Sequence, residues 1–149
     1  MTTRSCFLLL GGLLIGGSSV TGVARSLEIT IQALNGKDGK PLVHQRLLVF
    51  GGKTAEATSH HETHFEFTTD EKGFARMSFD PATTQWIEVF ADTLTLCISK
   101  PNFVQFNIDK ILRTGLATPN NCGAIATQLK PGQFTVFARS ATLREEMAW

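Results

Sequence analysis

A chain of 149 residues lies within the usual size of one domain, and 42% hydrophobic with 18% charged residues is the composition of an ordinary globular protein rather than a disordered or membrane-embedded one. The formal net charge is +1, and the sequence holds no basic run and no interleaving of basic and aromatic residues. This argues against nucleic acid, and against an anionic membrane surface, as the partner.

The first residues have the layout of a secretory signal peptide. Arg4 precedes an uncharged apolar segment, Cys6 to Gly17, and small polar residues then lead to Ala24. We expect a cleaved leader, residues 1–24 if cleavage follows Ala24, with Ser26 as the alternative cleavage point. Cleavage after Ala24 takes the net charge from +1 to zero, because residues 1–24 carry one cation, Arg4, and no acid. The alternative is an uncleaved anchor, although the apolar segment is shorter than the ~20 residues of a membrane-spanning helix. The expected location is periplasmic or extracellular, without permanent membrane insertion.

The next segments alternate between strand and turn patterns. Residues 27–34, LEITIQAL, place apolar and polar side chains on opposite faces, as in a half-buried strand. Residues 35–41 form a turn, because asparagine and glycine tolerate positive φ and the proline cannot join a strand ladder. A second strand runs from Arg46 to Phe50 and ends at a break, Gly51-Gly52. Residues 53–63 are polar, lack apolar periodicity and are expected to be irregular.

The middle of the chain predicts further strands with short connections. The expected strands are residues 64–69, 74–79, 86–91, 93–98 and 103–106. Residues 70–73, DEKG, are a turn whose glycine supplies positive φ. The strand at 86–91 has apolar residues on both faces, which implies burial on both sides.

One short helix is predicted near residues 108–114. Asn107 can cap its start, apolar residues recur at one-turn spacing from Ile108 to Leu112, and Gly115 can end it. A long irregular connection and a last strand, residues 134–139, follow. The spacing of turns favours an antiparallel β-sandwich of about seven strands over alternating strands and helices.

The C-terminal residues 140–149 are expected to form a short tail. Thr142 followed by Glu145 is a capping-box pattern for a frayed helix within it.

Two cysteines remain after removal of the leader with Cys6. Cys97 and Cys122 form an even pair in a chain that is expected to reach an oxidising compartment, and a disulfide is the simplest use for them. Closing a loop of roughly 25 residues contributes about 3 kcal/mol in the chain-entropy description. The alternative, a reactive or metal-binding thiol pair, lacks the C-x-x-C spacing of such sites.

Three of the four histidines lie in the segment His60-His61-Glu62-Thr63-His64. On an extended chain His60, Glu62 and His64 share one face, and His44 could join them as ligands of zinc or copper. The rise of ~3.3 Å per residue separates the two end histidines by about 13 Å, which favours a solvated loop over a single ion held by both. We find no catalytic constellation and no cofactor motif elsewhere.

Several motifs resemble the carboxypeptidase regulatory-like or prealbumin-like (transthyretin-like) β-sandwich domain. They are NGKDGKPLVHQRLLVF at residues 35–50, TTDEKGFARMSF at 68–79 and WIEVFAD at 86–92. The later segments ILRTGLATPNNCG and PGQFTVFAR look like the tail of short exported bacterial proteins that carry such a domain. The resemblance covers residues 27–139 and implies about seven strands in two sheets, used for adhesion, stabilisation or ligand presentation.

Two enzymatic relatives of this fold are tested by residues of the chain. The related intradiol dioxygenases hold iron with two tyrosines and two histidines, whereas this chain has no tyrosine. The related hydroxyisourate hydrolases end in Tyr-Arg-Gly-Ser, where this chain has Phe137-Ala138-Arg139-Ser140. The expectation is therefore a non-enzymatic exported module that binds a small ligand or another exported or cell-envelope protein, and the alternative is a periplasmic zinc- or copper-binding protein.

Overall fold

The computed structural model describes residues 26–99 and 104–141. The predicted signal peptide, the start of the strand predicted at 103–106 and the predicted C-terminal helix lie outside these ranges. Within these ranges, none of the helices has the length and apolar character needed to span a membrane.

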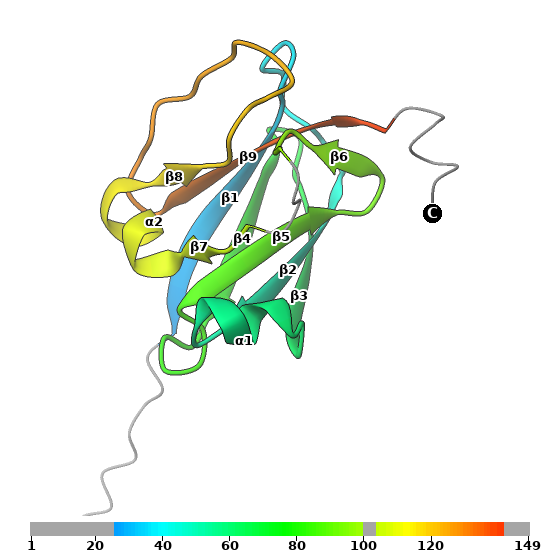
Figure 1. Cartoon of the computed structure of the whole chain (residues 1–149). Helices are drawn as coiled ribbons and strands as arrows, with labels where there is room; N and C mark the ends of the chain where they lie inside the picture. The colour runs from blue at the N-terminus through cyan, green and yellow to red at the C-terminus, as the bar shows by residue number, and fades with distance from the viewer. Residues whose placement is uncertain (1–25, 100–103, 142–149) are drawn as a thin grey trace, which may run out of the picture.

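The described chain is mostly β, with two short helices (Figure 1). The strands are β1 (Leu27–Asn35), β2 (Arg46–Gly52), β3 (Thr63–Thr68), β4 (Phe74–Phe79), β5 (Trp86–Ala91), β6 (Leu94–Leu96), β7 (Phe106–Asn107), β8 (Leu116–Ala117) and β9 (Gln133–Ser140), and the helices are α1 (Ala55–Ser59) and α2 (Ile108–Thr114). One sheet has the order β4-β1-β9-β6, with β8 beside β9, and the other has the order β3-β2-β5-β7. The two sheets give a β-sandwich-like layout.

The predicted sandwich layout and the helix near residues 108–114 are confirmed, but the all-antiparallel prediction is wrong for one sheet. β1 pairs in parallel with β9, with Ile31 opposite Phe134, and β8 also pairs in parallel with β9. These partners are not joined by hairpins, so no tight turn imposes an antiparallel direction on them. The described residues form nine strands rather than about seven. Two of the nine, β7 and β8, are only two residues long.

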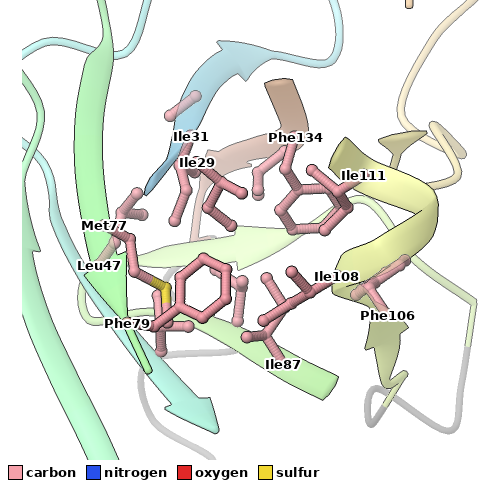
Figure 2. Close-up of a cluster of buried hydrophobic side chains, with 14 residues drawn as sticks. Ile29, Ile31, Leu47, Met77, Phe79, Ile87, Phe106, Ile108, Ile111 and Phe134 are labelled. Atoms are coloured by element: carbon pink, nitrogen blue, oxygen red, sulfur yellow. The ribbon is translucent and has the colours of Figure 1, made fainter. Parts of the chain in front are cut away.

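The main core lies between the two sheets and is closed at one end by α2 (Figure 2). The alternating apolar side chains of β1, β2, β4, β5 and β9 meet there, and Ile108 and Ile111 of α2 pack against them. The fully buried aliphatic and aromatic members include Ile29, Ile31, Leu47, Val49, Met77, Ile87, Phe134 and Val136. The alternation of the sequence thus predicts the inner faces of β1 and β4 correctly, whereas β2 and β5 carry apolar residues on both faces.

Helix α1 lies in the segment that the sequence predicts as irregular. Its five residues are too short to show helical periodicity, but Thr54 caps it by accepting a hydrogen bond from the backbone N–H of Ala57 at 3.0 Å. The helix packs on β2, where a Cβ on Gly52 would stand 2.6 Å from the backbone nitrogen of the buried Thr58. Gly51-Gly52 is therefore not a break after β2. The two glycines belong to the strand and leave space for its neighbours.

The predicted turn at residues 70–73 is confirmed. The Asp70 carboxylate accepts hydrogen bonds from the backbone N–H groups of Lys72 at 2.8 Å and Phe74 at 2.9 Å. These bonds, that from Phe74 foremost, hold the pKa of the Asp70 carboxyl below its ordinary value. Gly73 has a φ of 76°, so the turn uses glycine where the sequence predicts it.

The predicted disulfide between Cys97 and Cys122 is confirmed. It belongs to a second, smaller core with Leu34 and Phe137, on which the long connection before β9 packs. Asn120 ties the same connection down by donating hydrogen bonds to the carbonyl oxygens of Gly36 and Ile125, both at 2.9 Å. β9 is consequently buried on both faces over most of its length.

Candidate functional site

The outer face of the sheet β3-β2-β5-β7 carries a groove with a volume of about 560 Å³. Alternate residues of β2 and β5 supply it, because side chains two positions apart point to the same face of a strand. In the strand register Leu48 lies opposite Phe90, and Phe50 lies opposite Glu88. The lining side chains that matter below are Arg46, Leu48, Phe50, His61, Phe90 and Asp92. We call this concavity the outer groove.

Three rings form one aromatic cluster in the outer groove. His61 stacks on Phe50 with ring centroids 4.0 Å apart and planes 24° from parallel. Phe90 meets both edge to face, at 5.4 Å from Phe50 and 5.5 Å from His61. Such contacts hold the rings in defined positions, so the wall of the groove is rigid and largely apolar.

Ionised groups border the outer groove at one end. The Arg46 guanidinium donates to the Glu66 carboxylate at 2.8 Å and lies 3.5 Å from the Asp92 carboxylate. The hydrogen bond to Glu66, together with the charges of Glu66 and Asp92, holds the pKa of Arg46 above its ordinary value. All three side chains are exposed, so these pairs contribute little to stability and chiefly set the charge of this border.

A buried carboxylate lies beneath the aromatic cluster. Glu88 of β5 is only 1% exposed, although it points to the outer face of its sheet. One oxygen, Oε2, accepts a hydrogen bond from the Gln105 side chain at 3.0 Å and lies 3.6 Å from Nε2 of His61. Glu88 Oε1 and His61 Nε2 are both buried without a hydrogen-bond partner. Each unsatisfied polar atom costs about 1–3 kcal/mol, so this pair destabilises the fold where it lies.

His61 also adopts a strained backbone. Its φ of 56° lies in the left-handed region, which costs a residue with a Cβ about 1–2 kcal/mol. The backbone N–H of His61 donates to Thr58 O at the end of α1, and the ring is held by Phe50. Strain of this kind, beside two unpartnered polar atoms, is concentrated at functional sites more often than elsewhere.

The structure does not bring the four predicted metal ligands together. His60 is exposed at the end of α1, Glu62 and His64 are exposed further along, and His44 is exposed in the segment before β2. Among the described residues, no three or more histidine, cysteine, aspartate or glutamate side chains lie close enough together to hold a metal ion. The histidine that the pattern placed on the opposite face, His61, is the one that enters the outer groove.

Zinc binding provides a direct check on the histidine segment. We expect a calorimetric titration of zinc or copper to give the same heats for the unmodified protein and for a His60→Ala, His64→Ala double variant, since these side chains are not gathered around one point. A micromolar site in the unmodified protein that the double variant loses would contradict this expectation and would revive the metal-binding alternative.

Sequence reasoning missed the outer groove and Glu88. The signal that was present is a glutamate at the centre of the apolar strand WIEVFA, at the same alternation as Trp86 and Phe90. Two apolar faces predict burial on both sides of the strand. A carboxylate on such a face is then buried as well, and it needs a hydrogen-bonding partner from the protein or from a ligand. The side chains that contact Glu88 are His61, from the turn after α1, and Gln105, from the residues before β7, and strand periodicity cannot reveal these contacts.

The chain matches no protein-family model, no curated protein and no solved structure. The outer groove and the buried pair beneath it therefore carry the functional argument.

Proposed function

We propose that the chain is a non-enzymatic, exported β-sandwich module that binds a small ligand, or an apolar side chain of a partner protein, in the outer groove. The observation that carries the proposal is the groove itself. It is concave, its volume of about 560 Å³ falls within the usual range for ligand pockets, and rigid aromatic side chains form its wall. Export agrees with the leader-like start of the sequence and with the Cys97–Cys122 disulfide.

The chemistry of the lining suits binding. Leu48, Phe50 and Phe90 offer apolar surface to a ligand, and Arg46 and Asp92 border that surface with charge. The resemblance to prealbumin-like domains supports the same proposal, because such domains commonly present ligands or stabilise partners. The resemblance implies a layout of two sheets, and the structure has two sheets, one of them mixed.

Chemical-shift mapping with a library of small aromatic fragments tests the proposal. We expect the shifted amides to cluster on β2 and β5 around Leu48, Phe50 and Phe90, and we expect Phe50→Ala to weaken binding about tenfold or more, because the stacked wall is lost. Leu129→Ala is the matched control, since Leu129 is 48% exposed and lies on the connection that covers the other sheet. Shifts elsewhere on the protein, or fragments that ignore Phe50→Ala, would refute the outer groove as the binding site.

A further inference from the structure

The outer groove is bordered and underlaid by more negative than positive charge. Among the described residues of β2, β3 and β5 and the residue after β5, one cation, Arg46, lies there. The acids are Glu66, Glu88 and Asp92. Arg46 already engages Glu66 and Asp92. Glu88 is the carboxylate that Arg46 does not engage, and the low polarity around it strengthens its attraction for a cation.

The atoms without hydrogen-bond partners indicate that a ligand at this position would carry a hydrogen-bond donor. Glu88 Oε1 is an acceptor without a donor, and Nε2 of His61 beside it has no hydrogen-bond partner either. Gln105 satisfies only the other carboxylate oxygen. A positively charged N–H group would complete Glu88 through a charge-assisted hydrogen bond.

The position of His61 explains how a ligand in the groove reaches Glu88. The imidazole lines the outer groove on one side and contacts the carboxylate on the other. Nε2 of His61 has no hydrogen-bond partner, so a shift of this side chain away from Glu88 breaks no hydrogen bond of that atom and costs chiefly its stacking on Phe50. The rings of Phe50 and Phe90 offer π surfaces to a cation in its place.

We propose that the outer groove binds a small organic cation, an amine carried on an aromatic or apolar body, whose ammonium group is held by Glu88. This inference rests on the proposed function, because it names the chemical class of ligand for the same groove. The apolar body occupies the space beside Leu48, Phe50 and Phe90, and the ammonium displaces His61 from the carboxylate.

Three probes of matched size separate this inference from the proposed function. They are 2-phenylethylamine, the neutral 2-phenylethanol and the anionic 3-phenylpropionate, each titrated into the full chain and followed by chemical shifts. We expect the amine to bind about tenfold or more tightly than the alcohol, because a charge-assisted hydrogen bond in a buried site is added, and we expect the anion to bind least.

Substitution of Glu88 tests the residue assignment. Glu88→Gln keeps the shape of the side chain and one acceptor oxygen, which can still accept from Gln105, but removes the charge and the second acceptor. The affinity for the amine should therefore fall to that for the alcohol, while the affinity for the alcohol is unaffected. Glu28→Gln is the matched control at an exposed acid on β1 of the other sheet, and it should change the preference by about twofold or less. His61→Ala uncovers Glu88 and should leave the preference for the amine equal or larger, which tests the assignment even if Glu88→Gln does not fold.

The possible outcomes are distinct. If none of the three probes binds, the proposed function fails together with the inference. If the alcohol or the acid binds as tightly as the amine, or if the Glu88→Gln variant keeps the full preference, the organic cation is refuted while the groove stands. If the groove is instead buried in a concentration-dependent dimer that excludes all amines, the occupant is a second copy and the inference is likewise overturned.

Discussion

Reduction of the Cys97–Cys122 disulfide is expected to lower the free energy of unfolding by about 3 kcal/mol. The two cysteines are 25 residues apart in the sequence, so the bond removes a large set of conformations from the unfolded chain. It also holds the long connection before β9 against Leu34 and Phe137. Urea denaturation of the oxidised and the reduced protein measures the effect as a shift of the transition midpoint, and the two samples have the same sequence.

A Cys97→Ala, Cys122→Ala variant provides the control for this prediction. Cys97 is buried, so alanine is preferred to serine, whose hydroxyl would be left without a partner among apolar neighbours. The double variant should be about as stable as the reduced protein, apart from the loss of the two sulfur atoms, of which that of Cys97 belongs to a buried residue. Equal midpoints for the oxidised and reduced forms would contradict the prediction and would mean that the connection is held by its other contacts alone.

The sequence predicts much of the fold because β1, β3 and β4 follow simple alternation, and the apolar runs of β2 and β5 still indicate strands. Ile29, Ile31, Ala75 and Met77 are buried at the positions that a period of two requires, and the disulfide follows from the presence of two cysteines in a chain that is expected to be exported. The parallel pairing of β1 with β9 could not be predicted, since it joins the ends of the described chain and leaves no local turn signal.

The candidate site was harder to predict because it depends on contacts across the chain. The sequence favoured a solvated loop for the histidine segment, with a metal site as the alternative. In the structure the turn after α1 gives His61 a positive φ, and its ring lies against Phe50 and near Glu88. Strand alternation assigns faces only to residues that are in strands, and His61 lies before β3 rather than in it. The alternation of WIEVFA did place Glu88 beside Phe90 on one face, which was the only local indication of a site.

Truncation of Phe134 is expected to cost more than any other single change considered above. Its side chain is fully buried, it packs against Phe106 with ring centroids 4.6 Å apart, and its strand is the centre of the larger sheet, paired with β1, β6 and β8. Phe134→Ala removes the ring and leaves a cavity that the surrounding strands cannot close, which costs about 3–5 kcal/mol. Since a domain is stable by about 5–15 kcal/mol, the variant should melt far below the unmodified protein.

Leu129→Ala and Phe134→Leu complete the experiment as controls. Leu129 is 48% exposed, so its truncation should change the free energy of unfolding by about 0.5 kcal/mol or less. Phe134→Leu keeps most of the apolar volume and should cost clearly less than Phe134→Ala. Thermal unfolding of the three variants ranks them, and a Phe134→Ala variant as stable as Leu129→Ala would contradict the placement of β9 at the centre of the core. Because the outer groove lies on the other sheet, folded Phe134→Leu protein should still bind the probes, which separates loss of stability from loss of the site.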